Sequence, residues 1–206
     1  MKLKAKFFIV ILSVIISFNC NKSFDSISSY DDLYEVEKYK VYSAIIDAEI
    51  NPDLIFILNT TASRFWKQAE FNQALIFILD TTASGFWIQN ENPSYLPNAI
   101  QSIFPSLKLE TIENYQSFNA TRTFIEDKFN LSIDYQMISP SKIFDSSQHL
   151  FPVIDFTNVA FDRLYRQSLV YFSIRYSLGG YGRFLYLEKD GENWIIKKVS
   201  YIWSLR

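Results

Sequence analysis

The C-terminal part of the chain constrains the fold most, because its apolar runs are separated by very short turns. From Asn158 onward the sequence reads "NVAFDRLYRQSLVYFSIRYSLGGYGRFLYLEKDGENWIIKKVSYIWSLR". The turns are "DRLYR", "LGGYG" and "KDGEN", in which Gly179, Gly180 and Gly191 supply the positive φ angles that hairpins favour. Connections this short join antiparallel neighbours, so the pattern predicts a four-stranded antiparallel meander.

The segments before the meander have helical and strand patterns. The stretch that starts at Ser29 predicts a helix that ends before Pro52, and "LKLETIENYQSFNATR" predicts a second helix. "SYLPNAIQSIF" reads as a loop with one helical turn, "FNLSIDYQMIS" as a half-buried strand, and "SPSKIF" as the start of a short helix. The residues expected to face inward are Tyr34, Val41, Ile45 and Ala48 in the first helix, Leu109, Ile112 and Tyr115 in the second, and Phe129, Leu131, Ile133, Tyr135 and Met137 in the strand.

These patterns predict one α+β domain over residues 30–206. In it, the N-terminal helix and one or two further helices pack on one face of a curved antiparallel sheet. A chain of 206 residues is long enough for a real hydrophobic core. The net charge of −2 without basic clusters argues against nucleic-acid binding. A single cysteine and a single histidine exclude an internal disulfide and the usual closed zinc site, and we expect no cofactor.

The N-terminus, "MKLKAKFFIVILSVIISFNC", has three lysines, then an apolar run, then the only cysteine of the chain. The run from Phe7 to Phe18 is shorter than the ~20 residues that a transmembrane helix needs. We therefore expect a lipoprotein signal peptide over residues 1–19, with Cys20 as the lipidated first residue of the mature protein. Residues 20–29 then form a polar tether. The alternatives are a secretory signal cleaved nearby, an uncleaved N-terminal anchor, and a plain buried cysteine.

Two neighbouring stretches of the chain are near copies of each other. Residues 51–71 and 72–92 are identical at 14 of 21 positions, and each contains "LIFIL", a polar turn and "FW". The apolar run has the length of a buried strand, and burying each large side chain is worth about 1.5–3 kcal/mol. Both copies should therefore be accommodated, one within the sheet and the other as an edge strand or a flap. We expect the second copy, which contains Asp80, to hold the original place.

Several blocks in the right order resemble a group of uncharacterised bacterial secreted proteins and lipoproteins. They are "VYSAIID", "LIFILDTTASGFW" and the meander with its "LEKDGENWII" hairpin, and together they extend from about Val41 to Trp203. The resemblance implies export but no particular activity. Many relatives have cysteines around the Gly-rich hairpin, whereas Ile174–Gly182 has none, so no redox role is implied. The closing hairpin is also similar to those of cystatin-like and nuclear-transport-factor-like cone folds.

The polar residues after the second "LIFIL" are the main candidate site. Such a cluster at a strand end could bind a cation or a phosphate, but the same residues also form Asx or Ser/Thr turns. The first copy has Asn59 in place of Asp80. An enzymatic alternative pairs Asp80 with Asp155 or Asp162 as acid and base. The residues of the candidate cluster are Asp80, Thr81, Thr82 and Ser84.

The remaining candidates have simpler structural explanations. "SLGGYG" lacks the lysine of a phosphate-binding loop, and His149 has no evident partner. The tryptophans either line an aromatic pocket or belong to the core, and the arginines of the meander either receive an anionic group on one sheet face or are solvated. These residues are Trp66, Trp87, Trp194, Trp203, Arg163, Arg166, Arg175 and Arg183.

Taken together, the sequence predicts an envelope lipoprotein without enzymatic activity. It would be attached to the membrane through its N-terminal lipid and would bind a small ligand or an envelope protein in the concavity of its sheet. Asn21, directly after the cysteine, points to the outer membrane or to a surface that faces the periplasm. The alternative is a hydrolase-like enzyme that uses paired carboxylates.

Overall fold

The computed structural model of the chain describes residues 30–50, 75–83, 95–142, 152–176 and 179–205. The chain divides into two compact units, Met1–Glu35 and Val36–Arg206, and only the first residues of α2 are described in the first unit. The helices and strands are α2 (Tyr30–Glu49), β1 (Leu75–Leu79), α5 (Tyr95–Ile103), α6 (Leu109–Phe118), β2 (Asp134–Ile138), η1 (Pro140–Lys142), β3 (Val153–Phe156), β4 (Ala160–Phe161), β5 (Gln167–Tyr176), β6 (Gly179–Asp190) and β7 (Asn193–Leu205).

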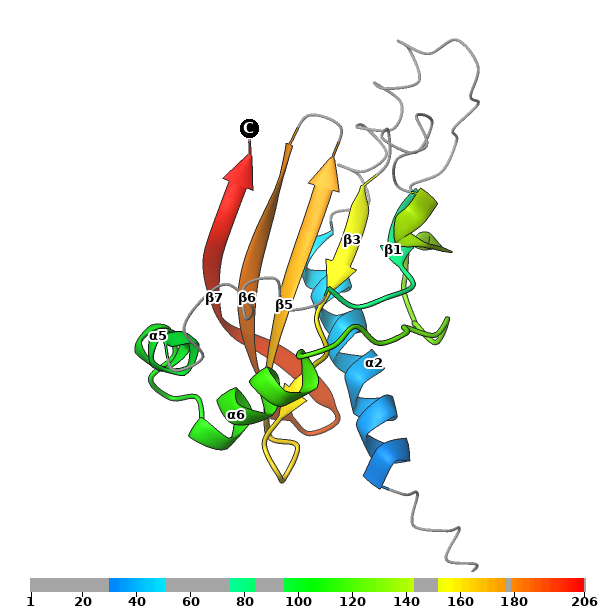
Figure 1. Cartoon of the computed structure of the whole chain (residues 1–206). Helices are drawn as coiled ribbons and strands as arrows, with labels where there is room; N and C mark the ends of the chain where they lie inside the picture. The colour runs from blue at the N-terminus through cyan, green and yellow to red at the C-terminus, as the bar shows by residue number, and fades with distance from the viewer. Residues whose placement is uncertain (1–29, 51–74, 84–94, 143–151, 177–178, 206) are drawn as a thin grey trace, which may run out of the picture. The chain divides into compact units, whose positions relative to one another are not determined.

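The sheet runs in the order β2-β1-β3-β5-β6-β7, and β4 pairs with the start of β5 (Figure 1). From β3 to β7 every pair is antiparallel, and β4, β5, β6 and β7 follow one another as neighbours. The predicted α+β class and the four-stranded meander are therefore confirmed. β6 pairs with β7 through two register shifts, one of them between Gly182 and Arg183.

Strand β1 departs from the expected antiparallel arrangement, because it pairs in parallel with both β2 and β3. Its residues Ile76 to Leu79 are all buried, as is typical of a parallel strand with both faces covered. The connection from β1 to β2 contains α5 and α6, and a crossover of this length is what parallel neighbours require. β1 is the "LIFIL" of the second copy, while the first copy lies outside the described residues.

Helices pack on both faces of the sheet, and the expectation of a single covered face is wrong. On one face Tyr42 of α2 packs on Phe156, with ring centroids 4.4 Å apart, and Phe156 packs on Phe172. On the other face Tyr171 joins a buried cluster that includes Tyr115 of α6. Tyr171 and Phe172 are consecutive residues of β5, so their side chains point to opposite faces. Figure 1 shows α2 behind the strands and α6 in front of them.

Other local predictions also differ from the structure. "YLPNAIQSI" forms the helix α5 rather than a loop, because a proline in the first turn of a helix displaces no intrahelical hydrogen bond. Leu109, at the start of α6, is 56% exposed, and Ala48 near the end of α2 is also exposed. Gly179 begins β6, and of the three glycines predicted to have positive φ angles only Gly191 has one.

Of the remaining residues predicted to face inward, Phe129 and Ile133 are buried and Tyr34, Leu131, Tyr135 and Met137 are half-buried. Val41 and Ile45 of α2 are fully buried, as are Ile112 and, nearly so, Tyr115 of α6. The alternation before and within β2 is also present, although the strand itself is limited to Asp134–Ile138.

Candidate functional site

A row of side chains crosses the sheet from β3 to β7 on one face. Asp155 of β3 is in register with Ser173 of β5, Ser173 with Gly182 of β6, and Gly182 with Trp203 of β7. Residues paired in this way present their side chains on the same face of a sheet. The register therefore brings one acidic group, one hydroxyl and one indole onto a single line across four strands.

Two further residues of β5 belong to this line. Tyr171 and Arg175 each lie two residues from Ser173, so all three share one face of the strand. We call Asp155, Tyr171, Ser173, Arg175 and Trp203 the polar row. Tyr171 and Ser173 are buried, whereas the side chain of Arg175 is 45% exposed.

The glycine in the middle of the row leaves room for its neighbours to meet. Trp203 donates a hydrogen bond from Nε1 to the hydroxyl oxygen of Tyr171 at 2.7 Å, directly above Gly182. A Cβ atom at Gly182 would lie 2.2 Å from that hydroxyl and 2.3 Å from the indole nitrogen. A glycine inside a strand pattern is the sequence signal of such a close approach, and it could have identified this site.

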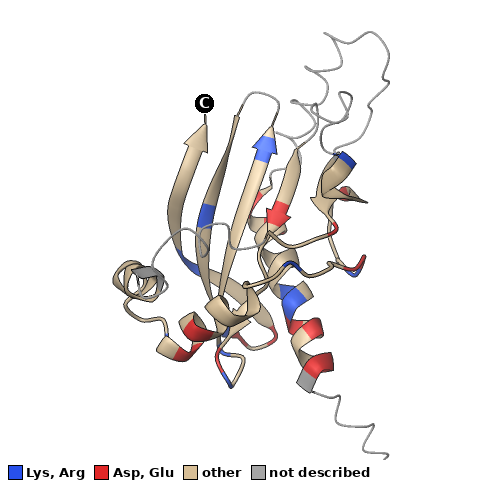
Figure 2. Cartoon of the chain, viewed as in Figure 1, with Lys and Arg blue, Asp and Glu red and all other residues tan. Residues whose placement is uncertain are grey.

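The charged end of the row is the pair formed by Asp155 and Arg175. Nη2 of Arg175 lies 3.8 Å from Oδ2 of Asp155, which is too long for a hydrogen bond. Figure 2 shows the acidic position on β3 in red and the basic position near the end of the neighbouring strand β5 in blue. Oδ1 of Asp155 is buried and has no hydrogen-bond partner among the described residues.

The carboxyl of Asp155 is electrostatically perturbed. Burial raises its pKa to about 6, against the opposing effects of the positive charges on Arg175 and Arg122 and of hydrogen bonds from the backbone of Phe156 and Ala83. Asp155 also acts on its neighbour Tyr171, whose pKa is raised mainly by burial and further by this negative charge. A carboxyl that titrates near neutral pH beside a guanidinium is the arrangement found at binding and catalytic sites.

The predicted cluster after β1 lies at the end of the strand next to β3. The register of Ile78 with Ile154 aligns Leu79 with Asp155 and Asp80 with Phe156, so Asp80 and Asp155 point to opposite faces of the sheet. Oδ1 of Asp80 and Oγ1 of Thr81 are buried and, within the described part of the chain, have no hydrogen-bond partner. Satisfying these oxygens needs a donor from elsewhere.

Thr82 has a structural role. Its Oγ1 accepts a hydrogen bond from the backbone N–H of Thr123 at 2.9 Å, and its own N–H donates to the carbonyl of Thr123 at 2.8 Å. Thr82 therefore links the end of β1 to the loop before β2. Ser84 lies outside the described residues.

Asp162 belongs to a different part of the molecule. Its neighbour Phe161 pairs with Ser168, five residues along β5 from the Ser173 that faces Asp155, which is a distance of about 17 Å. The alternative that pairs Asp80 with Asp162 therefore does not agree with the structure. Asp162 instead accepts hydrogen bonds from the backbone N–H groups of Arg166, at 2.6 Å, and Gln167, at 2.9 Å.

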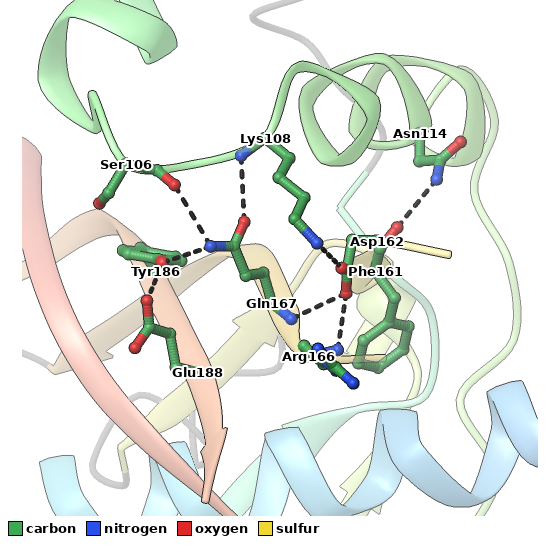
Figure 3. A network of polar contacts seen from close by, with 9 residues as sticks. All are labelled: Ser106, Lys108, Asn114, Phe161, Asp162, Arg166, Gln167, Tyr186 and Glu188. Carbon is green, nitrogen blue, oxygen red and sulfur yellow. Dashed lines mark hydrogen bonds and ion pairs between the residues drawn. The ribbon is translucent and has the colours of Figure 1, made fainter. Parts of the chain in front are cut away.

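Figure 3 shows that Asp162 and Gln167 together hold the loop before α6 against the sheet. We call these two side chains the clamp. The carboxylate of Asp162 also pairs with Lys108, and these hydrogen bonds outweigh the effect of burial and lower its pKa. The side-chain amide of Gln167 bonds the carbonyl of Ser106 at 3.2 Å, the N–H of Lys108 at 3.0 Å and the hydroxyl of Tyr186 at 2.9 Å. The clamp fixes the α5–α6 connection to β5 and β6.

A hollow of about 510 Å³ opens beside the clamp, between the turns that follow β4 and β6. Its cations are largely engaged, because Lys108 pairs with Asp162 and Lys189 with Glu37 at 2.9 Å. The hollow is therefore close to charge balance and offers no clear preference for an anionic ligand. Its lining residues are Lys108, Leu164, Tyr165, Arg166, Gln167, Glu188, Lys189 and Gly191.

The arginines of the meander do not gather on one face. Arg163 and Arg166 are exposed in the turn after β4. Arg175 lies on the face of the polar row, whereas Arg183 pairs with Glu49 of α2 on the opposite face. Arg183 is nearly buried there, and its guanidinium lies 4.2 Å from the ring centroid of Tyr181.

The two described tryptophans differ in role, one in the core and one in the polar row. Trp194 is a core residue that donates from Nε1 to Glu37 at 2.8 Å, whereas Trp203 belongs to the polar row. The other predicted candidates lie outside the described residues, and they are Cys20, Trp66, Trp87 and His149.

No protein-family model, curated protein or solved structure matches the chain. Among the described residues, no three His, Cys, Asp or Glu side chains stand close enough to hold a metal ion. No helix in the part of the chain that the structure describes combines the length and the apolar character needed to span a membrane. The assignment of a function therefore depends on the chemistry of the polar row.

Proposed function

We propose that the protein is an exported, lipid-anchored envelope protein whose folded domain binds a small ligand at the polar row. The observation that carries the proposal is the pair of Asp155 and Arg175, which lie side by side at 3.8 Å without a hydrogen bond between them. A ligand that bonds both groups would complete a contact that the protein leaves open.

The energetics of Asp155 support a role in binding. A carboxyl whose pKa is raised by burial destabilises the folded state whenever it is ionised. Residues that lower stability in this way are concentrated at functional sites, where activity compensates for the cost. A purely structural position in a sheet would be better served by an apolar or neutral residue.

A small ligand agrees better with the row than a protein partner does. Tyr171 is 6% exposed and Ser173 is 3% exposed, so the middle of the row lies below the surface that a globular partner could touch. Protein interfaces instead depend on groups that protrude or form wide surfaces. Binding also needs only the one charged pair that the row contains, whereas the enzymatic alternative needs a second carboxyl beside Asp155.

The sequence of the N-terminus supports export and attachment to a membrane through a lipid. Three lysines, the apolar run and Cys20 form the pattern of a lipoprotein signal, and the residues after Cys20 are polar. The protein would then be held at the outer membrane or at a surface that faces the periplasm, with the domain free to meet ligands beside the membrane. No nucleic acid and no cofactor are part of this proposal.

Native mass spectrometry of the protein extracted gently from its own membranes tests both parts. We expect a chain that starts at Cys20 with a lipid-sized increment, and an additional non-covalent mass. Asp155→Asn should lose that additional mass, whereas Arg163→Gln, a matched loss of charge in the exposed turn after β4, should keep it. An adduct that survives Asp155→Asn would place the ligand elsewhere, and a wild-type protein without any adduct would contradict the proposal.

A further inference from the structure

We propose that the hollow beside the clamp lies against the membrane surface and binds the headgroup of a zwitterionic phospholipid that has a primary ammonium. This contact depends on the lipid anchor of the proposed function and lies apart from the polar row. Three features carry it: the charges that line the hollow, the exposed leucine at its rim, and the place where the chain from Cys20 reaches the sheet.

One cation and one acid of the hollow have no oppositely charged partner among the described residues. Arg166 makes hydrogen bonds only through its backbone, to Asp162 and Lys189. Glu188 accepts a hydrogen bond from the hydroxyl of Tyr186, and no ion pair in the described part of the chain includes it. Because the two other cations of the hollow are paired, its wall offers one guanidinium and one carboxylate to a ligand.

A ligand with one charge of each sign satisfies both groups. A phosphate accepts two hydrogen bonds from a guanidinium, and a primary ammonium donates hydrogen bonds to a carboxylate. A quaternary ammonium has no N–H to donate, and a headgroup with a net negative charge would leave Glu188 uncompensated beside a further anion. The hollow of about 510 Å³ lies within the range of about 300–1,000 Å³ that is usual for small-molecule sites.

The leucine at the rim favours a lipid over a dissolved zwitterion. Leu164 is 61% exposed and lines the hollow from the turn after β4. The next residue, Tyr165, has a φ of 51°, which is uncommon for a residue with a side chain, and it is buried against Phe161 with ring centroids 4.9 Å apart. The turn therefore presents Leu164 outward. An exposed apolar side chain beside a polar hollow suits the boundary between lipid headgroups and acyl chains.

The chain from the lipid reaches the sheet at the end where the hollow lies. Lys40 of α2 pairs at 3.2 Å with Glu192, in the turn after β6 that borders the hollow. Glu49, nine residues or about 14 Å further along the helix, pairs with Arg183 instead. A lipid on Cys20 therefore precedes the end of the sheet with the hollow more closely along the chain than it precedes the opposite end.

Fluorescence quenching in vesicles tests the contact on the lipidated full chain. Arg163→Cys introduces a labelling site beside the hollow, and Ser204→Cys introduces one near the far end of β7, while the lipid occupies the sulfur of Cys20. The vesicles consist of phosphatidylcholine alone or mixed with phosphatidylethanolamine or phosphatidylglycerol, and all contain a lipid with a nitroxide quencher on its headgroup. We expect the label at position 163 to be quenched more than the label at position 204, and most strongly with phosphatidylethanolamine.

Variants of the chain labelled at position 163 identify the groups involved. Arg166→Gln and Glu188→Gln should each lower the ratio of docked to undocked molecules at least about tenfold. Leu164→Ser should lower the ratio about tenfold, because an apolar side chain no longer leaves water. Lys197→Gln, a matched loss of charge at an exposed position of β7 outside the lining, should dock as the wild type does. Thermal melting of each variant shows that lost docking is not a lost fold, and Arg166→Lys is a second, milder change.

The outcomes separate this contact from the proposed function. Equal quenching at both positions, on a chain that mass spectrometry shows to have its lipid, would overturn the contact and leave the anchor. Stronger docking on phosphatidylglycerol would overturn it as well, and so would variants of Arg166 and Glu188 that dock as the wild type does. A label at position 163 that is shielded from water in native membranes but not in pure lipid would assign the surface to a protein partner. A chain without a lipid would contradict the proposed function, and this contact with it.

Discussion

At Gly182 a single hydrogen atom is the largest side chain that the neighbouring groups allow. An alanine there would place its methyl group 2.2 Å from the Tyr171 hydroxyl and 2.3 Å from the Trp203 indole nitrogen. We expect Gly182→Ala to lower the free energy of unfolding by about 1–3 kcal/mol, because β6 and β7 would have to separate. Urea denaturation measures this. Gly191→Asn is the control, because Gly191 has open space around it and asparagine tolerates its φ of 60°.

If Gly182→Ala proved as stable as the control, the hydrogen bond above Gly182 would not be a fixed part of the fold. The double variant with Tyr171→Phe offers a second check. It removes the hydroxyl that would lie nearest to the new methyl group, so it should recover part of the lost stability.

The raised pKa of Asp155 predicts a dependence of stability on pH. Its ordinary value is 3.8 and its value in the fold is about 6, so the folded state binds this proton more tightly than the unfolded chain does. The resulting stabilisation is fully present below about pH 4 and is lost as the pH rises through about 6. The difference corresponds to about 3 kcal/mol. Asp155→Asn should therefore gain stability relative to the wild type between pH 4 and pH 7.

Urea denaturation at a series of pH values measures this difference. Asp134→Asn, on the exposed side of β2, controls for the loss of one acidic group. A constant difference between Asp155→Asn and the wild type from pH 4 to pH 8 would mean that the carboxyl titrates normally, and the energetic support for a binding role would be lost.

At the scale of single elements, the clamp of Asp162 and Gln167 holds the α5–α6 connection against the sheet. Asp162→Ala would leave two backbone N–H groups and Lys108 without their acceptor. We expect a loss of about 2–3 kcal/mol in unfolding free energy, measured by urea denaturation at neutral pH. Glu110→Ala, an exposed change in the first turn of α6, should stay within about 0.5 kcal/mol.

The effect of Asp162 should also depend on pH, in the direction opposite to that of Asp155. Its pKa is lowered in the fold, so its contribution is present above the ordinary value of 3.8 and is lost as the pH falls through the lower folded value. The difference between wild type and Asp162→Ala should therefore shrink in strong acid. A difference that stays the same there would assign the effect to packing rather than to the carboxylate.

Elements fixed by local sequence could be predicted, whereas those that depend on distant parts of the chain could not. The meander could be predicted because each hairpin is specified within a few residues by its turn and its alternating strands. The parallel pairing of β1 could not, because it depends on a crossover through two helices and on a partner strand far along the chain. The segment of α5 was predicted as a loop because it contains a proline. A proline breaks a helix in its interior but is tolerated in the first turn, where it lies here.

The site was only partly predictable for the same reason. Asp155 and Arg175 could each be singled out as candidates, but their pairing depends on the register between β3 and β5. A shift of one residue would move every side chain of a strand to the opposite face, and no local signal in this region fixes the register. The polar residues after β1 were found because they directly follow a recognisable strand.

At the scale of the whole molecule, deleting each copy of the duplicated block in turn tests which copy the fold requires. The strand of the second copy is β1, which lies between β2 and β3 inside the sheet. Deletion of residues 51–71 should therefore leave a protein that melts cooperatively near the wild-type temperature. Deletion of residues 72–92 puts the first copy, with Asn59 and Arg64, in the place of β1 and should lower the melting temperature more. Differential scanning calorimetry compares these two variants of equal length. If the first deletion abolished cooperative melting, both copies would be required for the fold.

The attachment of the molecule to the membrane is predicted to depend on Cys20. The apolar run before it covers Phe7 to Phe18, too few residues to span a bilayer that needs about 20. Firm attachment then requires a lipid with more than one acyl chain, because a single chain binds a membrane only reversibly. Cys20→Ser should therefore move the protein from the membrane fraction to the soluble fraction after cell lysis, and mass spectrometry should find no lipid on it. Asn19→Ala, beside the cysteine, should remain in the membrane fraction with its lipid. A Cys20→Ser protein that stayed in the membrane and still began at Met1 would show that the apolar run itself is the anchor.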